Sequence, residues 1–518
     1  MLRLPQSFWV RVVLVALAGA ASVLGFAPLY AWPVIIVALV MLFACWWQAR
    51  STRESAAIGF AFGFGLFVAG VSWLYVSLHV FGGMPAPMAA IAVALFCAYL
   101  SLWPALAGVL VHRWRAGPGW RLIAIMPVAW VGAEMLRAWF LTGFPWLVVG
   151  YSQAPAADML SPLAGYAPVL GVYGISWLLA VSAGIIVWMV GRNDETPTAA
   201  SSDDAQPSRS RQKGGAALAA IWLTGIALQW AQWTEPSGKP ITVSLAQGNV
   251  AQHLKWREDQ RDATLKNYLE LVSDAKGRLI VLPETALPLF SHEIPPPVIE
   301  SFEARARANG GDLLLGVAYL GALRADGTTP YFNGAISLGQ SPNQRYAKQH
   351  LVAFGEFVPP LFSWVYQWLS IPLSGFTPGR TDQASMQLAG HRVAVNICYE
   401  DTFGREIARP LPTAELLVNV SNMAWYGRSL AADQHAQFSQ MRALETGRWM
   451  LRSTNTGVTA AIDHRGRIVA ALPQWTRGML ETTATPRQGT TPYVWWHDWA
   501  IALLMLAAAG LALARGRV

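Results

Sequence analysis

Charged residues are scarce in this chain of 518 residues: only 13% are Asp, Glu, Lys or Arg, whereas 54% are hydrophobic. Soluble domains average about 25% charged residues, so the composition excludes an ordinary soluble enzyme. Together with 25 tryptophans and a positive mean hydropathy, the deficit indicates a polytopic membrane protein with one sizeable soluble part.

Cysteine is also rare, with three residues in the chain. Cys45 and Cys97 fall within apolar stretches, so Cys398 is the one cysteine of the soluble region. It has no local partner for a disulfide, and no CxxC or Cys/His spacing suggests zinc. No glycine-rich nucleotide fingerprint stands out either. We therefore expect neither a metal nor a cofactor.

The net charge of +8 suggests nucleic-acid binding at first sight. However, the basic residues lie in short clusters between apolar stretches, as membrane topology requires, and not along one soluble face. We expect no nucleic-acid partner.

Apolar stretches of about 20 residues are long enough to cross a bilayer as helices. The sequence contains eight of them, at about 8–26, 31–48, 57–79, 88–111, 121–141, 166–190, 216–233 and 494–514. The first also resembles a signal peptide, because Arg3 precedes it and small residues end it. A second apolar stretch follows after only a short turn, which favours a retained helical hairpin. We predict seven spans before the soluble region and one after it.

Basic residues occur in alternate loops. They are Arg3, Arg11, Arg50, Arg53, Arg113, Arg115, Arg121, Arg192, Arg209, Arg211, Lys213, Arg515 and Arg517. The intervening loops near 26–30, 80–87 and 142–165 contain no Lys or Arg. By the positive-inside rule, the basic loops and both termini are cytoplasmic and the soluble region is extracytoplasmic.

The predicted spans divide the chain into three parts. They are a membrane domain at 1–233, an extracytoplasmic domain at 234–493, and a final span with a short cytoplasmic tail at 494–518.

Within the membrane domain, Glu134 and Arg137 lie one helical turn apart near the outer end of a span. We expect them to pair with each other, with orientation of a lipid headgroup as the alternative.

The soluble region alternates strand and helix patterns. Strands are predicted at 241–249, 278–284, 312–320, 332–339, 392–400, 415–422, 457–463 and 467–472, and helices at 257–274, 296–309 and 429–448. This alternation predicts an α/β domain with buried sheets.

Cys398 ends one of these strands. Val393, Val395 and Ile397 alternate with smaller or polar neighbours, which is the period-two pattern of a strand, and acidic residues follow the cysteine. A thiol at the carboxyl end of a strand is a candidate nucleophile. A buried structural cysteine is the alternative.

Two further polar residues lie at comparable places. Glu284 ends the apolar run RLIVLP, and Lys348 is flanked by apolar residues, where an ammonium needs a carboxylate partner. If they converge with Cys398, the carboxylate can take the thiol proton and the ammonium can stabilise an oxyanion. This is a set of groups for acyl transfer.

A Cys/His pair is the rival arrangement. His391 is excluded because seven residues along one strand place it roughly 23 Å from Cys398 and on the opposite face. His350 and His435 remain possible bases, although we rank both below Glu284.

The contexts LPETA, YAKQHLVAFGEFVP and ICYED, in this order, resemble the nitrilase superfamily. Seven preceding spans, one following span and the block SNMAWYGRS resemble, within it, the apolipoprotein N-acyltransferase family. The resemblance covers essentially the whole chain. It implies a polytopic α-helical membrane base of about eight spans with an extracytoplasmic nitrilase-like αββα sandwich.

The resemblance also implies roles for individual residues. Glu284 corresponds to the general base, Lys348 to the oxyanion stabiliser and Cys398 to the nucleophile. Further functional positions of the family match Glu356, Tyr399, Glu400, Trp256 and Trp425. Structural alternatives are interfacial packing for the two tryptophans and ion pairing with Lys348 for Glu356. The chain departs from the family at Leu282, where a tryptophan is common, which puts local packing or acyl-chain contacts in doubt.

The partners implied by the resemblance are a phospholipid acyl donor, a diacylglyceryl-modified lipoprotein acceptor and the lipid bilayer. The implied location is the bacterial inner membrane, with the catalytic domain on the periplasmic side, and we expect a monomer.

The stretch 357–376 is apolar and aromatic without a charged residue, so it is predicted as a core helix or as a lid that enters the bilayer. Gly375 and Gly379 are candidate hinges.

The implied reaction has two steps. The thiolate first takes the acyl chain from a phospholipid as a thioester, and the N-terminal amine of the acceptor then attacks this thioester. A membrane-tethered amidase, in which water replaces the amine, is the alternative within enzymes. A non-catalytic lipid carrier is disfavoured because no member of the Glu, Lys and Cys set is missing.

Overall fold

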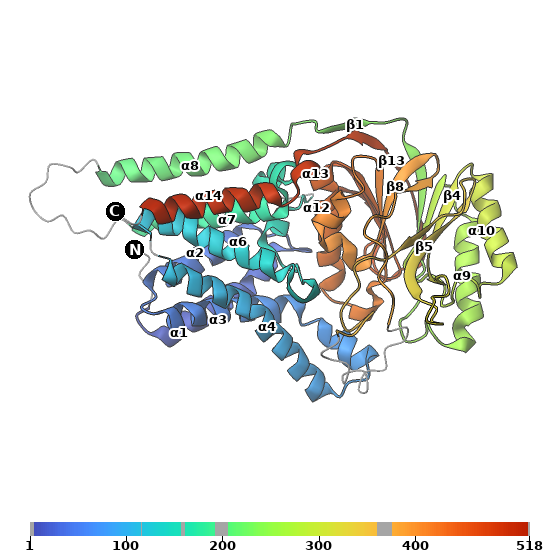
Figure 1. Ribbon diagram of the computed structural model, residues 1–518, viewed down its shortest axis with the longest axis horizontal. Helices are drawn as coiled ribbons and strands as arrows, with labels where there is room; N and C mark the ends of the chain where they lie inside the picture. The colour runs from blue at the N-terminus through green and yellow to red at the C-terminus, as the bar shows by residue number, and fades with distance from the viewer. Residues whose placement is uncertain (1–4, 115, 157–160, 192–205, 360–374, 516–518) are drawn as a thin grey trace, which may run out of the picture. The chain divides into compact units, whose positions relative to one another are not determined.

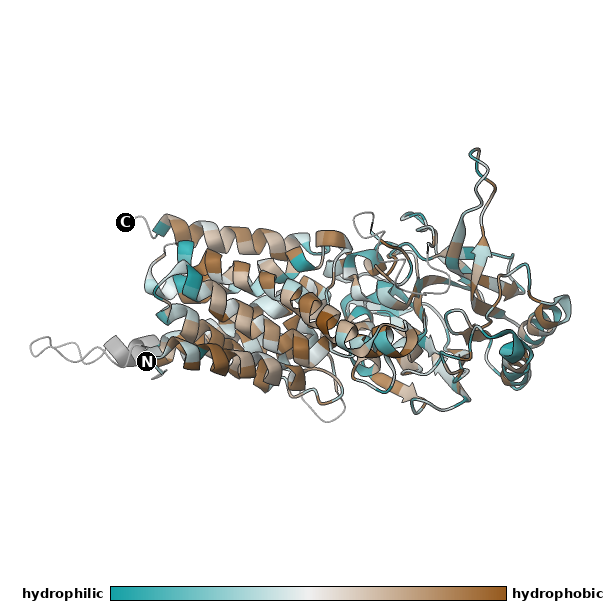
Figure 2. Ribbon diagram, turned by 90° about the horizontal axis from the view of Figure 1, so that it is seen from below, coloured by the Kyte–Doolittle hydropathy of each residue, from teal (hydrophilic) through white to brown (hydrophobic). Residues whose placement is uncertain are grey.

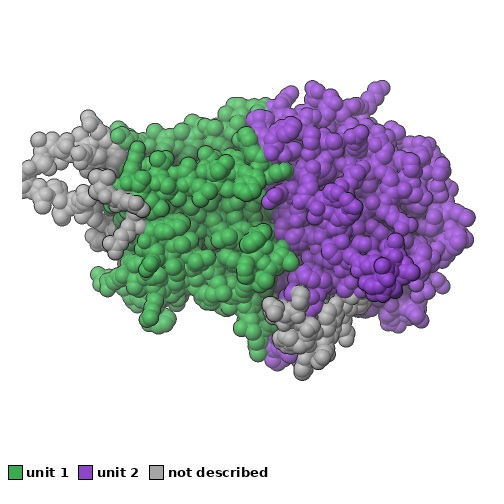
Figure 3. All heavy atoms as spheres, viewed as in Figure 1, with its two compact units in different colours: residues 1–72, 90–231, 496–518 green, residues 73–89, 232–495 purple. Residues whose placement is uncertain are grey.

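The computed structural model describes residues 5–114, 116–156, 161–191, 206–359 and 375–515 (Figure 1). The chain divides into two compact units, which are coloured separately in Figure 3. Unit 1 comprises Met1–Ser72, Ala90–Ala231 and Trp496–Val518, and unit 2 comprises Trp73–Ala89 and Gln232–Trp495.

Unit 1 is helical. Its long helices are α1 (Phe8–Ala21), α2 (Pro33–Gln48), α3 (Thr52–Val71), α4 (Ala86–Arg113), α6 (Met126–Arg137), α7 (Ala167–Gly191), α8 (Gln206–Leu228) and α14 (Trp499–Arg515). Their residues are mostly hydrophobic (brown in Figure 2). Among the described residues, five helical segments are long and apolar enough to cross a membrane: Phe8–Gly25, Thr52–Val71, Ala86–Arg113, Pro118–Arg137 and Pro162–Gly191. The apolar helices α2 and α14 are shorter.

Close backbone approach explains two glycines of unit 1. A Cβ on Gly19 of α1 would lie 2.0 Å from the carbonyl oxygen of Phe62, and one on Gly65 of α3 would lie 1.9 Å from that of Ala16. Small residues at such a crossing let two apolar helices pack backbone to backbone. The buried side chain of Arg11 and the half-buried side chain of Glu54 form an ion pair between the same two helices.

The loop after α6 is held by the two charged residues predicted to pair. Arg137 donates to the carbonyl oxygens of Phe144 and, at 2.7 Å, Trp146. Glu134 accepts a hydrogen bond of 2.9 Å from the backbone of Val149. Both residues are buried, and both therefore fix the aromatic loop at 144–149.

Unit 2 contains two six-stranded sheets. The first has the order β13 (Gly478–Ala484), β2 (Ile241–Gln247), β3 (Leu279–Leu282), β4 (Asp312–Leu320), β5 (Tyr331–Gly339), β6 (Arg345–Ala347). The second has the order β12 (Ile468–Ala471), β11 (Ala460–Ile462), β10 (Trp449–Thr454), β9 (Leu416–Ser421), β8 (His391–Ile397), β7 (Met386–Leu388). In each sheet the three neighbouring strands β2–β3–β4 or β8–β9–β10 are parallel. A small sheet pairs β1 (Thr234–Pro236) with β14 (Arg487–Gly489).

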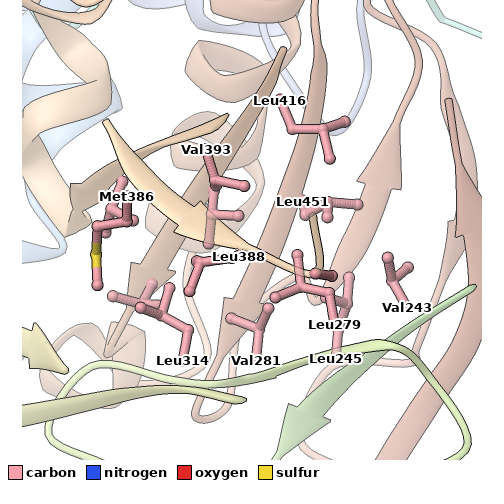
Figure 4. Close-up of a cluster of buried hydrophobic side chains, with 14 of the residues drawn as sticks. Val243, Leu245, Leu279, Val281, Leu314, Met386, Leu388, Val393, Leu416 and Leu451 are labelled. Carbon is pink, nitrogen blue, oxygen red and sulfur yellow. The ribbon is translucent and has the colours of Figure 1, made fainter. Parts of the chain in front are cut away.

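The two sheets pack face to face. Apolar side chains from both of them, among them Val281, Leu314, Val393 and Leu451, point toward one another in a shared core (Figure 4). Helices cover the outer faces: α9 (Arg261–Ser273) and α10 (Pro296–Ala308) on the first sheet, and α11 (Gly404–Ala408) and α12 (Ala431–Thr446) on the second (Figure 1). The predicted αββα sandwich is confirmed.

The predicted strands and helices of the soluble region all contain an element of the predicted type. Strands β1, β6, β7, β10, β13 and β14 were not predicted. In β10 the reason is composition, because Arg452, Ser453 and Thr454 read as surface residues although all three are fully buried.

Candidate active site

Cys398 follows directly after the buried strand β8 and begins the 3-10 helix η10 (Cys398–Thr402). Its φ of +52° lies in the left-handed region, which a residue with a Cβ rarely adopts. Such backbone strain persists only where the surrounding structure enforces it, and it clusters at active sites. The turn therefore presents the half-buried thiol at the end of the strand, as the sequence predicts.

The main chain of Cys398 is held by side chains. Its carbonyl oxygen accepts hydrogen bonds of 3.1 Å from Nε2 of His435 on α12 and 3.1 Å from Nδ2 of Asn419 on β9. Both donors are buried.

Glu284 lies two residues beyond the end of β3 and is buried. Its Oε1 accepts a hydrogen bond of 2.8 Å from Nδ2 of Asn333 on β5, and its Oε2 accepts one of 2.9 Å from the backbone of Asn422. The carboxylate is thus held by Asn333 of the first sheet and by the backbone that directly follows β9 of the second.

Lys348 follows β6 and is almost fully buried, with 1% of its surface exposed. Its Nζ lies 2.9 Å from the carboxylate of Glu356 and 3.5 Å from that of Glu284. Burial alone would lower the pKa of Lys348, but the two carboxylates outweigh it and raise the pKa well above its usual range. The side chain is therefore an ammonium at any physiological pH.

Cys398 belongs to the same electrostatic cluster. Burial raises the pKa of its thiol, the carboxylate of Glu284 raises it further, and the ammonium of Lys348 opposes both. The net shift is upward, so the resting side chain is a thiol. Deprotonation on attack then requires a base, and Glu284, whose charge acts on the thiol, is the candidate.

Glu356 is an ion-pair partner of Lys348 and also accepts hydrogen bonds of 2.6 Å from Asn333 and 2.8 Å from the backbone of Val352. Its own carbonyl oxygen accepts from the backbone of Gly375, at 2.8 Å, and of Phe376. The predicted lid or core helix at 357–376 has residues 360–374 outside the described part of the chain.

Glu400 connects the turn of Cys398 to the turn of Lys348. Its fully buried carboxylate accepts from the backbone of Ile397 at 2.6 Å, of Gln349 at 2.7 Å and of His350 at 3.2 Å. Burial raises the pKa of Glu400 to about 7, although these donors act in the opposite direction.

Of the three aromatic candidates, Tyr399 lies in the turn of Cys398 and the two tryptophans lie in other segments. The ring of Tyr399 packs against Phe403, with centroids 5.2 Å apart. Trp425, in the 3-10 helix η11 (Met423–Tyr426), makes an edge-to-face contact with Phe81 at 6.1 Å. Trp256 is half-buried and follows the buried Lys255.

The histidines have other partners. His391 lies at the start of β8 with Nδ1 3.3 Å from Glu415, which agrees with its exclusion as a base. His350 stacks on Phe403 at 3.7 Å and pairs with Glu406. His435 contacts the carbonyl oxygen of Cys398, as described above.

Several site residues were missed by the sequence reasoning. They are Asn333, Asn419, Asn422, Lys255, Asp401 and Arg452. The signal that could have found the first two is a lone asparagine within an otherwise apolar strand, in FNGAISLG and LLVNVSN. Such a residue must be hydrogen-bonded where the strand is buried.

Among the described residues, no group of three or more His, Cys, Asp or Glu side chains is arranged to hold a metal ion. The site instead combines a protonated thiol, a buried carboxylate and a buried ammonium. This arrangement suits proton transfer, nucleophilic attack on a carbonyl carbon and stabilisation of the resulting oxyanion.

Comparison with known proteins adds to this geometry. A sequence model of the apolipoprotein N-acyltransferase N-terminal domain matches residues 18–185, and one of carbon-nitrogen hydrolases matches residues 242–492. An apolipoprotein N-acyltransferase of Nitrosomonas europaea is 46% identical over 98% of both chains. Those of Chromobacterium violaceum and Methylococcus capsulatus are 41% and 42% identical over 97% and 98% of this chain and 94% and 97% of their own.

Proposed function

The chain belongs to the apolipoprotein N-acyltransferase family, and we propose that it takes an acyl chain from a membrane phospholipid and passes it through Cys398 to a lipoprotein. As a member of this family it is a membrane-bound acyltransferase of lipoprotein maturation. The proposal concerns the donor, the intermediate and the residues that act.

In the first step, Glu284 takes the proton of the Cys398 thiol while the sulfur attacks the carbonyl carbon of a phospholipid ester. The negative charge that develops on the carbonyl oxygen is stabilised by the ammonium of Lys348. The C–O bond of the ester then breaks, and the proton on Glu284 goes to the departing lysophospholipid. The acyl chain remains on Cys398 as a thioester.

In the second step, the α-amine of the diacylglyceryl-cysteine attacks the thioester. Glu284 accepts a proton from the amine, the C–S bond breaks, and this proton returns to the sulfur. A thioester suits this transfer because amines attack it far more readily than they attack an oxygen ester. Tyr399, Trp256 and Trp425 are proposed to contact the substrates, and Glu356 and Glu400 to hold Lys348 and the two turns.

One observation carries this proposal: the Lys348 ammonium, fully buried, lies between two carboxylates in the same charge cluster as a thiol on a strained turn. A buried charge has a large desolvation cost. An ion pair that only stabilised the fold would need two charged groups, whereas this cluster buries three. The cluster is instead arranged to move one proton and to receive one negative charge.

The placement in the cell follows from the charges of the loops. We propose a monomer in the inner membrane of a bacterium, with both termini cytoplasmic and unit 2 periplasmic. The described apolar helices support a location in a membrane.

The test is a mass measurement on the full chain in phospholipid vesicles without an acceptor. The expected product is a hydroxylamine-labile fatty-acyl group on the Cys398 peptide, which Cys398→Ala and Glu284→Gln should lack. A lipopeptide with a diacylglyceryl-cysteine should then discharge it. Lack of an adduct on a protein that still acylates the lipopeptide would refute the thioester.

The same experiment distinguishes the amidase alternative. A transferase intermediate is stable in water and is lost rapidly to the amine, whereas a hydrolase intermediate is lost in water alone. We expect the first behaviour.

A further inference from the structure

The carbonyl oxygen of Cys398 is held from two sides, by His435 and Asn419, each at 3.1 Å. Hydrogen bonds to the carbonyl oxygen of a residue hold the peptide group that follows it. The backbone of Cys398, with φ of +52°, is in an unfavourable conformation, which persists only where neighbouring groups hold it. These two bonds therefore bear directly on where the Cα–Cβ bond of Cys398 points. They act on the geometry of the thiol without contacting its sulfur.

The protonation state of His435 follows from its neighbours. A guanidinium nitrogen of Arg452 lies 2.6 Å from Nδ1, and a guanidinium only donates, so Nδ1 is an acceptor. The ring proton is then on Nε2, which lies 2.8 Å from Oδ1 of Asp401 and 3.1 Å from the carbonyl oxygen of Cys398. His435 is thereby fixed as a neutral donor.

The groups that face His435 come from three elements. Cys398 and Asp401 belong to η10, Arg452 belongs to β10, and Met423 of η11 places its sulfur 3.0 Å from Nδ1. Arg452 and Asp401 pair with each other at 3.0 Å, so their charges balance. Burial first, and the charge of Arg452 second, lower the pKa of His435, in agreement with the neutral ring.

We propose that His435 is a positioning residue for Cys398, which donates from Nε2 to the cysteine carbonyl and holds the strained turn that presents the thiol. It is not the base of a Cys/His pair. The proposal rests on the proposed function only in that Cys398 is the nucleophile.

Two substitutions separate this role from general packing. The amide nitrogen of a glutamine reaches the place of Nε2, so His435→Gln retains a donor to the Cys398 carbonyl. An asparagine amide reaches only the place of Nδ1, so His435→Asn retains a group for Arg452 and loses the donor. His391→Asn is the matched control, because it replaces a histidine at the start of β8, at the opposite end of that strand from Cys398.

The first measurement is alkylation of Cys398 by iodoacetamide on the full chain in vesicles, followed over pH by mass spectrometry of the Cys398 peptide. The second is the rate of acyl-adduct formation from phospholipid. A misplacement of a reacting group by about 1 Å costs about 100-fold in rate. We expect a loss of about that size in adduct formation for His435→Asn, and less than about tenfold for His435→Gln. The control should match the unchanged protein.

The comparison of the glutamine and asparagine variants tests against packing, and the pH profile of alkylation separates a positioning role from a role as base. If His435 only positions the thiol, the midpoint of the alkylation profile is the same in His435→Gln as in the unchanged protein. A shifted midpoint, or equal losses in the glutamine and asparagine variants, would overturn the proposal.

If His435→Asn does not fold, as judged by its thermal unfolding midpoint, Asn419→Ala removes the other donor to the same carbonyl. Slower adduct formation in that variant supports the proposal, and an unchanged rate contradicts it. Failure of the unchanged protein to form any adduct would refute the proposed thioester, while alkylation would still report on the positioning of the thiol.

Discussion

The two sheets of unit 2 hold their proposed catalytic residues by different means. At the end of the first sheet, Glu284 and Lys348 are held by charge, since each contacts an oppositely charged side chain and Asn333 bridges the carboxylates. At the end of the second sheet, Cys398 is held by its main chain, through donors to its carbonyl oxygen. The first arrangement sets the protonation states of charged side chains, and the second sets the direction in which the Cys398 side chain points.

This difference explains the distribution of buried charge. On the second sheet, Asp401 is paired with Arg452, and its carboxylate raises the pKa of the Cys398 thiol less than that of Glu284 does. On the first sheet, two carboxylates surround one ammonium, which leaves one negative charge to receive a proton. Substitutions on the first sheet should therefore alter pH dependence, and those on the second should alter rate without moving the pH profile.

The largest effect is expected for Lys348→Met, which removes the ammonium and keeps the length of the side chain. Glu284 and Glu356 would then face each other without a cation, so one of them would take up a proton and cease to be a base. Loss of one oxyanion donor costs about 100- to 1,000-fold, and we expect adduct formation to fall by at least that much. The measurement is the adduct rate on the folded chain, and an active variant would remove Lys348 from the mechanism.

The next effect concerns Glu400, which joins the two turns. Glu400→Gln loses at least one acceptor for the backbone of Ile397, Gln349 or His350, so both turns should loosen and adduct formation should fall by about tenfold or more. An unchanged rate would mean that the turns are held without it.

The same residue predicts a pH dependence of stability. Because burial raises the pKa of Glu400 from 4.5 to about 7, its contribution to stability is fully present below pH 4.5 and is lost as the pH rises through 7. The thermal midpoint of the unchanged protein should therefore fall over this range relative to that of Glu400→Gln. If the thermal midpoints of the two proteins changed with pH in parallel, Glu400 would not be the source of this pH dependence.

Asn333→Leu should have a smaller effect. The substitution removes the amide that donates to both Glu284 and Glu356, and the ammonium then remains as their shared neutralising group. The carboxylate of Glu284 then has one donor fewer to hold its position, so we expect adduct formation to slow by less than about tenfold. His391→Asn provides the control, and an unchanged rate would mean that the carboxylate of Glu284 is held without Asn333.

Sequence patterns located Glu284 and Cys398 because each follows a short, buried apolar strand, and Lys348 because apolar residues flank it. Their supports could not be located in the same way. Asn333 and Asn419 lie within apolar strands, and Arg452 lies in a strand that was not recognised, since its buried polar residues find their partners in other elements. The periodicity of one sequence indicates which residues are buried. It does not indicate which distant side chains form hydrogen bonds with the buried polar ones.

The smallest effect is expected for Lys255→Met, which tests whether main-chain support also exists on the first sheet. Nζ of Lys255 lies 3.3 Å from the carbonyl oxygen of Glu284 and 3.4 Å from the hydroxyl of Thr285, whose φ is +44°. Burial lowers the pKa of Lys255 from 10.5 to about 8, so its charged form destabilises the folded state below pH 8, and this cost fades as the pH rises from 8 to 10.5.

Lys255→Met should therefore raise the thermal midpoint at pH 7 while it slows adduct formation by about threefold to tenfold, since the turn of Glu284 loses a donor. The gain in stability should shrink above pH 8, which repeated melting curves would show. A variant that loses both stability and rate would assign Lys255 to packing. A more stable and slower variant would mean that the base, like the thiol, is held by its main chain, and the contrast between the two sheets would then be confined to Lys348.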